Sequence, residues 1–255
     1  MALNFRQTEI LDIARAEGRV LVDDLAERFD VTLQTIRRDL TDLADSGLLD
    51  RVHGGALPRT GVVNIGYDER RRMNQAEKAA IARACAARIG DNCSLILNLG
   101  TTTEAVAREL LAHRNITVIT NNMNVANILV ANPSCEVIVA GGTLRRSDGG
   151  LVGDLTAYFF EQFKVDLAVI GASALDQDGD LLDFDLAEVR VSKAIIRQAR
   201  QTYLVADHSK LGRSAPARLA SLSEIDRMFT DRPLPAGLAE RCQELGTAIE
   251  VAAGR

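Results

Sequence analysis

The stretch VLVDDLAERFDVTLQTIRRDLTDLADSGLL, residues 20–49, decides the fold of the first part of the chain. Asp30-Val31-Thr32 interrupts its apolar pattern, and Thr32 is a suitable N-cap for a second helix. The apolar side chains of that helix recur three or four residues apart and predict a buried stripe: Leu33, Ile36, Leu40 and Leu43. Two short helices joined by a three-residue turn are typical of a helix-turn-helix.

The polar positions of the second helix suit the major groove of DNA. Gln and Arg can form paired hydrogen bonds with base edges, and Thr and Arg can hold phosphates. The next segment, LLDRVHGGAL (48–57), alternates weakly and turns at Gly54-Gly55, which predicts a β-hairpin wing. The candidate DNA-binding residues are Thr32, Gln34, Thr35, Arg37, Arg38, Thr41, Arg51 and His53.

An alternative interpretation of residues 1–57 is a helical dimerisation or docking module with solvated arginines. Charge supports it, since this segment contains eleven Asp and Glu against seven Arg. We favour DNA binding because the cap, the turn, the helical period and the wing all agree. A single recognition helix covers few base pairs, so we expect a homo-oligomer, a dimer or a tetramer, on repeated half-sites.

The remainder of the chain changes character after a predicted linker at residues 58–74, PRTGVVNIGYDERRRMN. From residue 75 to 255, near-continuous apolar runs alternate with amphipathic segments, which predicts a largely parallel α/β sheet covered on both faces. The expected strands are CSLILNL, ITVIT, CEVIVAG, VDLAVIGA, TYLVAD and RMFTD. The expected helices span about 75–89, 103–112, 123–131, 154–163, 185–200 and 236–246.

Several of these segments carry a family resemblance that spans nearly the whole chain. TIRRDL and HGGA resemble the N-terminal signature of DeoR-family bacterial transcriptional regulators, and TNNMNVANIL, AGGTLRRSDGGLVG and LDFDLAEVRVSKAII extend the likeness. The resemblance implies an N-terminal winged helix-turn-helix and a C-terminal α/β sensor domain similar to phosphosugar isomerases (ribose-5-phosphate isomerase and CoA-transferase type). It also implies double-stranded operator DNA and a small phosphorylated effector as partners. Glycerol 3-phosphate is the expected effector, and another sugar phosphate remains the alternative.

Four polar or glycine-rich loops follow predicted strands: LGTTTE (99–104), TNN (120–122), AGGTLRRSDGG (140–150) and ADHSKLGR (206–213). In open parallel sheets ligands bind beyond the carboxyl ends of the strands, so these loops should converge on one crevice. Their hydroxyls, amides and cations suit a phosphorylated polyol. The candidate effector-binding residues are Gly100, Thr101, Thr102, Thr103, Asn121, Asn122, Gly141, Gly142, Arg145, Asp183, Asp185, Glu188 and Lys210.

The loop LGTTTE has two compatible interpretations. Gly100 permits close backbone approach, and a helix beginning near Thr102 would aim free N–H groups at an anion. Alternatively, Thr101 and Glu104 have the spacing of a capping box. Capping leaves the glycine, Thr102 and Thr103 unexplained, so we predict that these three present an anion site.

Catalysis is the competing prediction for the second domain. In the isomerases that this domain resembles, a DGADE-like loop supplies catalytic carboxylates; the matching segment here, IGASAL, has Ile170, Ser173 and Ala174 at those places. Glu188 could still act as a base. We predict a binding domain and no enzyme, with an isomerase as the alternative. Adjacent Asp207, His208 and Ser209 without a GxSxG elbow do not indicate a hydrolase.

The bulk composition agrees with a globular regulator. The 255 residues are 47% hydrophobic with a formal net charge of −5, so any DNA-binding surface must be local. We expect no signal peptide, no membrane span and a cytoplasmic location. Four cysteines without CxxC spacing and three scattered histidines predict free thiols, no metal and no cofactor.

Overall fold

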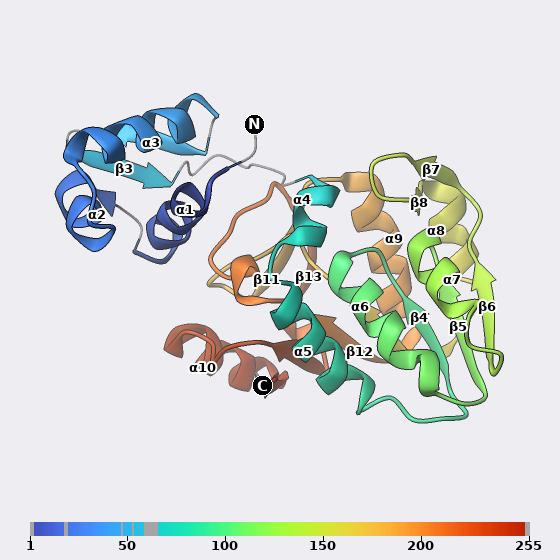
Figure 1. Cartoon of the computed structure of the whole chain (residues 1–255). Coiled ribbons are helices and arrows are strands. Elements are labelled where there is room, and N and C mark those ends of the chain that lie inside the picture. Colours follow the sequence, from blue (N-terminus) through green and yellow to red (C-terminus); the bar gives the residue numbers. More distant parts are fainter. Residues whose placement is uncertain (1–2, 18–19, 47, 53, 59–65, 253–255) are drawn as a thin grey trace. The chain divides into compact units, whose positions relative to one another are not determined.

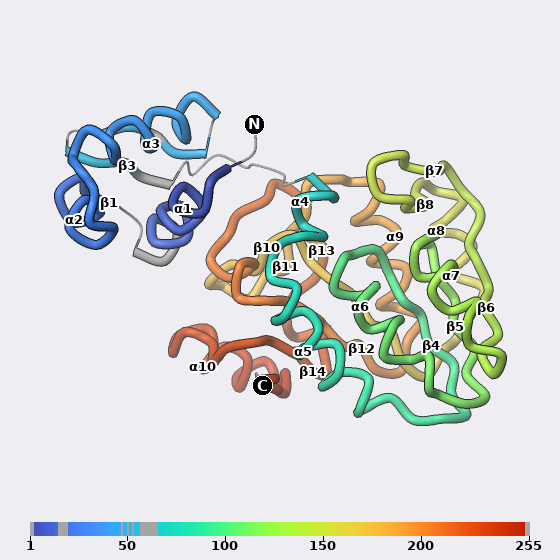
Figure 2. The backbone as a smooth tube through the Cα atoms, in the orientation of Figure 1, coloured from blue at the N-terminus to red at the C-terminus, as the bar shows by residue number. Residues whose placement is uncertain are grey.

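The computed structural model describes residues 3–17, 20–46, 48–52, 54–58 and 66–252. The chain divides into two compact units, Met1–Val63 and Asn64–Arg255. Figures 1 and 2 follow the chain through both, and each unit is described by itself below.

The described residues of the first unit form three helices and a small antiparallel sheet. Its elements are α1 (Phe5–Glu17), β1 (Val20–Leu21), α2 (Val22–Arg28), α3 (Leu33–Asp45), β2 (Leu49–Val52) and β3 (Gly55–Pro58). The sheet has the order β1-β3-β2, with β2 and β3 paired as a hairpin. Gly55 is required where β3 meets β1, because a Cβ there would lie 2.0 Å from the carbonyl oxygen of Val20. The predicted helix-turn-helix with a wing is therefore confirmed.

Helix α3 forms largely as its sequence pattern predicts. The hydroxyl of Thr32 accepts a hydrogen bond from the backbone N–H of Thr35 at 3.2 Å, so Thr32 is the N-cap. Ile36, Leu40 and Leu43 are fully buried in the core of this unit. Leu33 is 42% exposed, which corrects its assignment to the core stripe. It is the first residue of the helix, before the turn that packs inward.

The second unit is built on a seven-stranded sheet in which every pair is parallel. The strand order is β15-β14-β12-β9-β4-β5-β6. The strands are β4 (Ser94–Leu97), β5 (Ile116–Thr120), β6 (Cys135–Val139), β9 (Val165–Ile170), β12 (Ala199–Val205), β14 (Arg227–Thr230) and β15 (Ala248–Val251). The last strand, β15, was not predicted, because its alternation is short and follows the final expected helix.

Helices cover both faces of this sheet, as predicted (Figure 1). They are α5 (Gln75–Ala86), α6 (Thr101–Glu109), α7 (Met123–Leu129), α8 (Asp154–Phe160), α9 (Leu186–Arg197) and α10 (Ala236–Leu245). Side chains alternate along each strand: Leu95 and Leu97 of β4 share one core with α5, α6 and α7. Ile96 belongs to the opposite core, with α8, α9 and α10.

The order of the strands creates a switch point between β4 and β9. From β4 the chain moves outward through β5 and β6, then returns to β9 beside β4 and moves outward the other way. The loops that leave β4 and β9 therefore diverge. Ligand sites of open parallel sheets occur in the crevice that such divergence opens.

Two further features adjust the predicted organisation. Helix α4 (Tyr67–Arg72) lies inside the stretch predicted as a linker, and it belongs to the second unit. The six residues of α4 make too short a periodic pattern to stand out in the sequence. The segment GDLLDFD contributes strand β11 (Asp180–Asp183), which pairs with β10 (Ala174–Leu175) and β13 (Ala217–Ser221). A β-hairpin of β7 (Thr143–Arg145) and β8 (Gly150–Val152) completes the unit.

Candidate functional site

The outer face of α3 carries the polar residues predicted to contact DNA. The side chains of Gln34, Arg37 and Arg38 are exposed. Within the described residues, the guanidinium groups of Arg37 and Arg38 form no hydrogen bond or ion pair, so both are available to an external anion. Thr32 and Thr35 are joined by a hydroxyl hydrogen bond of 2.9 Å at the start of the helix.

The wing is tied to this helix through Arg51. Its Nη1 donates to the carbonyl oxygen of Arg37 at 3.0 Å and to the hydroxyl of Thr41 at 2.9 Å. Thr41 in turn donates to the same carbonyl at 2.8 Å. Thr41 and Arg51 thus orient the wing against the helix while remaining exposed. His53, the other wing candidate, lies outside the described residues.

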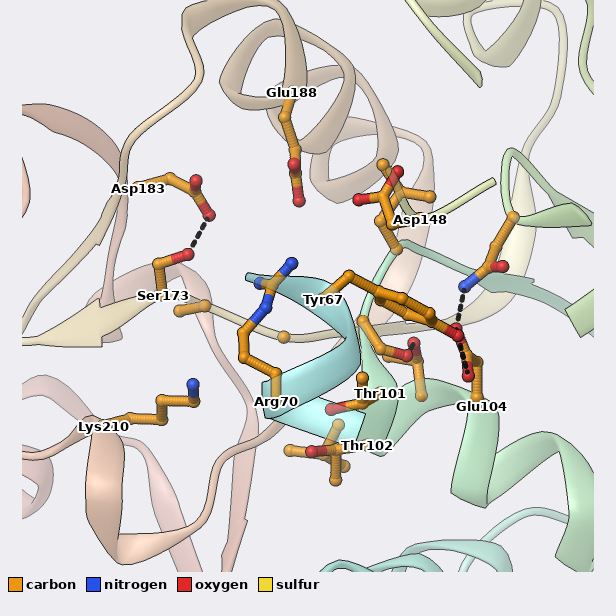
Figure 3. Close-up of a pocket in the computed structure, with 17 residues that line it drawn as sticks. Tyr67, Arg70, Thr101, Thr102, Glu104, Asp148, Ser173, Asp183, Glu188 and Lys210 are labelled. Carbon is orange, nitrogen blue, oxygen red and sulfur yellow. Dashed lines mark hydrogen bonds between the residues drawn. The ribbon is translucent and has the colours of Figure 1, made fainter. Parts of the chain in front are cut away.

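A pocket lies at the switch point of the second unit, lined by loops that follow β4, β9 and β12 and by helix α4 (Figure 3). Of the predicted effector residues, the structure brings eight into its lining: Gly100, Thr101, Thr102, Thr103, Asn122, Asp183, Glu188 and Lys210. The lining also includes Tyr67, Arg70, Leu99, Glu104, Asp148, Gly171, Ala172, Ser173 and Val205.

One side of the pocket is cationic. Figure 3 shows the side chains of Arg70 and Lys210 on the same side as Thr101 and Thr102. Within the described part of the chain, neither cation has an acidic partner within ion-pair distance, and neither threonine hydroxyl makes a hydrogen bond. Helix α6 begins at Thr101 after Gly100, whose φ of 143° favours glycine, so the first N–H groups of a nine-residue helix meet this side.

Lys210 is held half-buried by a single turn, His208–Lys210, that follows β12. Asp207 caps this turn by accepting from the N–H of Ser209 at 3.0 Å. Burial lowers the pKa of the Lys210 ammonium to about 8, against the attraction of Asp207 and with repulsion from Arg213, Arg70 and Lys78. An anion bound beside Lys210 would favour its charged form.

The opposite side of the pocket carries carboxylates. Figure 3 places Asp183, Glu188 and Asp148 there. Asp183 accepts from the hydroxyl of Ser173 at 3.0 Å and from the N–H of Phe184 at 2.6 Å. Burial, together with the charge of Asp183, raises the pKa of Glu188 to about 7, and Arg145 opposes that rise. Carboxylates in such a setting accept hydrogen bonds from hydroxyl groups.

Arg145 lies outside the pocket lining and forms ion pairs with two of the carboxylates that line it. Its guanidinium contacts Asp148, Asp185 and Glu188, each at 2.6 Å. Burial would lower the pKa of Arg145, but the hydrogen bonds and charges of Asp148 and Glu188 outweigh it and raise the pKa. This pairing corrects the expectation that Arg145 binds the effector, because four of its five N–H donors are already occupied by carboxylates. Asp185 also lies outside the lining, where it caps α9 through the N–H of Ala187.

Three other predicted residues lie away from the pocket. Asn121 donates to the carbonyl oxygen of Leu151 at 3.1 Å. Gly141 accepts from the hydroxyl of Thr156 at 2.8 Å. Gly142 has a φ of 142°, and a Cβ there would lie 1.9 Å from the Oγ1 of Thr156. Gly142 therefore lets this segment pack closely against α8, and Gly141 contributes its carbonyl oxygen there. Neither glycine lines the pocket, which corrects their assignment to the effector site.

The threonine loop also differs from its prediction in detail. Helix α6 begins at Thr101, one to two residues before the predicted start, and Gly100 stands at the N-cap without a side-chain hydrogen bond. The predicted capping box of Thr101 and Glu104 is therefore wrong. The buried Thr103 hydroxyl bonds to the carbonyls of Asn98 and Gly100, at 2.9 and 2.7 Å, and steadies the loop. The side chain of Thr103 is thus not a free donor, and Thr101 and Thr102 are left for an anion.

Sequence reasoning missed Tyr67, Arg70, Glu104 and Asp148 as parts of this site. The Tyr67 hydroxyl meets both carboxylate oxygens of Glu104 at 3.0 Å, and Asn124 donates to that hydroxyl and to Glu104. Burial and the charge of Glu104 raise the pKa of Tyr67 to about 12. The one available signal was the isolated aromatic residue and arginine run within an otherwise irregular segment, YDERRR.

Other chemistries find little support in the described residues. His208 Nδ1 lies 2.7 Å from Asp231, and Asp207 accepts hydrogen bonds from Asn74 and Ser209, so Asp207, His208 and Ser209 do not form a hydrolase triad. In the described part of the chain, no group of three His, Cys, Asp or Glu side chains could hold a metal ion. None of the described helices is long and apolar enough to cross a membrane. All four cysteines are free thiols.

Comparison with known proteins accounts for both units. Residues 6–60 match the DeoR-like helix-turn-helix domain, and residues 73–232 match the DeoR C terminal sensor domain. The glycerol-3-phosphate regulon repressor of Escherichia coli (strain K12) is 43% identical, over 92% of this chain and 93% of that protein. Its Haemophilus influenzae counterpart is 40% identical over 100% and 99%. A D-ribose-5-phosphate isomerase in complex with phospho-erythronic acid is 18% identical over 52% of each chain, with a TM-score of 0.40. The chain therefore belongs to the DeoR family, with a helix-turn-helix domain followed by a sensor domain.

Proposed function

We propose that the chain is a cytoplasmic transcriptional repressor that binds operator DNA through α3 and its wing, and that a small phosphorylated metabolite releases it. Glycerol 3-phosphate is the effector we assign. The repressors to which the chain is similar at 40–43% identity over nearly its whole length support this assignment.

The observation that carries the proposal is the two-sided chemistry of the pocket. Arg70, Lys210 and the start of α6 offer positive charge and N–H donors on one side. Asp183 and Glu188 offer acceptors on the other. A phosphate bound at the first side would direct the hydroxyl groups of a short polyol toward the second.

Release requires that the effector prefer the form of the protein that binds operator weakly. The operator must then weaken effector binding by the same factor, because the two equilibria are linked. Since one recognition helix reads few base pairs, the proposed repressor acts as a homo-oligomer on two or more half-sites.

The test is a titration of an operator duplex, selected by the chain from a random-sequence pool, with and without millimolar glycerol 3-phosphate. Glycerol and inorganic phosphate serve as controls, because glycerol has the hydroxyl groups of the ligand without its phosphate and inorganic phosphate has the phosphate without the polyol. We expect glycerol 3-phosphate alone to weaken binding by about 5- to 150-fold, the usual range of allosteric coupling. Unchanged affinity would remove the effector assignment, and a panel of other sugar phosphates would then test the alternative.

A second candidate function is isomerisation of a phosphosugar, and Glu188 is the observation that favours it. Its pKa of about 7 suits a base that moves a proton between adjacent carbons. Arg145 holds one of its oxygens at 2.6 Å, however, and the IGASAL loop supplies no second carboxylate. A turnover assay on pentose and hexose phosphates distinguishes the two functions: turnover that is lost in Glu188→Gln would favour the enzyme.

A further inference from the structure

Helix α4 stands at the start of the second unit and also contributes to the effector pocket. It begins four residues after the end of the DNA-binding unit, so it is the first helix of the sensor domain that the chain reaches. Two of its side chains, Tyr67 and Arg70, line the effector pocket. The same short helix is therefore close in sequence to one unit and part of the ligand site of the other.

The start of α4 is fastened to the pocket wall. Tyr67 donates to the buried carboxylate of Glu104, at the first turn of α6, and Asn124 of α7 donates to the Tyr67 hydroxyl at 3.0 Å. Asn124 also reaches the carbonyl oxygen of Asp148 at 2.9 Å. A movement of α4 would break these bonds between buried or half-buried groups, so its place is specified.

The end of α4 is held by a different set of partners. The buried ammonium of Lys78 donates to the carbonyl oxygens of Arg70 and Met73. Asn74 follows α4 in the left-handed conformation, with φ 50°, and donates to Asp207 at 2.9 Å. Asp207 caps the turn that carries Lys210. The end of α4 and the Lys210 turn are thus joined through one side chain.

Of the two α4 residues that line the pocket, Arg70 is the one whose side chain has no partner among the described residues. Its Nε is buried and makes no hydrogen bond within the described residues. Figure 3 shows its side chain directed into the pocket, between Lys210 and Tyr67. A buried guanidinium Nε without a partner is costly, and a phosphate or carboxylate is the ligand that its planar donors fit.

We propose that Arg70 binds the phosphate of the effector together with Lys210, and that α4 is the element through which effector binding reaches the DNA-binding unit. The inference rests on the proposed function. Two like charges that face each other repel, and a dianion between them replaces repulsion with attraction. Because Arg70 lies on α4, this change from repulsion to attraction exerts a force on the helix. The hydrogen bonds of Tyr67 and Lys78 define the position of α4.

The experiment measures two quantities on the full chain: the Kd of glycerol 3-phosphate by calorimetry, and the ratio of operator Kd values with and without saturating glycerol 3-phosphate. Arg70→Gln removes the charge, and Arg70→Lys keeps a point charge without the paired donors. Arg72→Gln is the matched control, since Arg72 is an exposed arginine in the same helix outside the pocket lining.

We expect Arg70→Gln to weaken glycerol 3-phosphate binding by about 10- to 100-fold, as the loss of a hydrogen bond between charged groups does. Arg70→Lys should recover part of that loss, and Arg72→Gln should bind as the wild type does. Thermal unfolding without ligand checks that each variant is folded. If Arg70→Gln binds glycerol 3-phosphate within about twofold of wild type, the assignment of Arg70 is overturned.

The transmission step has its own variant. Tyr67→Phe removes the bonds from α4 to Glu104 and Asn124 but keeps the ring and the cations. We expect its operator ratio to fall at least about threefold below the wild-type ratio, because a loosely held α4 transmits less of the binding free energy. An unchanged ratio overturns the role of α4. If glycerol 3-phosphate does not change operator binding by the wild-type chain, the proposed effector is overturned. If it does, and the Arg70 and Tyr67 variants behave as the wild type does, only this inference is overturned.

Discussion

The recognition helix α3 and the pocket of the sensor domain both present cations that have no acidic partner among the described residues, but one set is exposed to water and the other is half-buried. On α3 the arginines are exposed, neighbours in sequence and set by one helical period. In the pocket, Arg70 and Lys210 come from segments 140 residues apart and are partly removed from water. An exposed cation contributes little binding free energy by itself, so DNA binding depends on many contacts with phosphates. A half-buried cation is less screened by water, so a single phosphate contact contributes much more.

The largest effect is expected for substitutions in the recognition helix α3. Replacement of Arg37 and Arg38 together by Ala should weaken binding to the selected operator by more than about 100-fold, because base-edge contacts are worth about 1–3 kcal/mol each. Gel retardation measures this, and thermal unfolding should show an intact fold because both side chains are exposed. Retained specific binding in the double variant would mean that another surface reads the DNA.

The next effect tests the pocket side. Lys210→Met keeps the apolar stem and removes the charge, so glycerol 3-phosphate binding should weaken by about 10- to 100-fold. Operator binding without effector should match the wild type, since Lys210 belongs to the other unit. Calorimetry and gel retardation give the two values. Equal effector affinity in Lys210→Met and wild type would show that the phosphate binds elsewhere.

The pH dependence of effector binding is expected to be smaller. Because the pKa of Lys210 lies near 8 without ligand, the lysine loses its charge as pH rises through that value. Binding of a dianion must then restore the proton, so affinity should be greatest below about pH 8 and fall by up to about tenfold per pH unit above it. Calorimetry at about pH 7 and about pH 9 measures the change. The same decline in Lys210→Met would assign it to another group.

The smallest effect concerns one hydroxyl at the start of α6. Thr102→Val keeps the shape of the side chain and removes its hydrogen bond, so effector affinity should fall by about 3- to 10-fold. Operator binding without effector should stay the same. Thr103→Val is the informative comparison, because its hydroxyl bonds to Asn98 and Gly100, and its loss should lower the melting temperature. A larger effect on affinity in Thr103→Val than in Thr102→Val would reverse the roles assigned here.

Sequence patterns predicted the elements that local rules determine. Thr32 as a cap, the buried stripe of α3 and the alternation of β4 each depend on residues within a few positions of one another. The exposed Leu33 shows the limit at a helix end, where the period continues but the packing does not.

The pocket was predicted only in part, because partners distant in sequence decide which polar groups remain free. In the sequence Arg145 lies in a loop after a predicted strand and Arg70 lies in the predicted linker, so only Arg145 was expected at the effector site. Three carboxylates, including Asp185 and Glu188 some 40 residues away, occupy Arg145, whereas none reaches Arg70 among the described residues. The threonine loop shows the same effect: Tyr67, 37 residues upstream, takes the Glu104 that the capping box would have used.

The most direct test of the central claim is a reciprocal one. Calorimetry should give the Kd of glycerol 3-phosphate for the free chain and for the chain saturated with the selected operator duplex. If one protein couples the pocket to the recognition helix, the duplex must weaken effector binding by the same factor by which effector weakens operator binding. Equal effector affinity with and without DNA would contradict the account, because the two sites would then be independent.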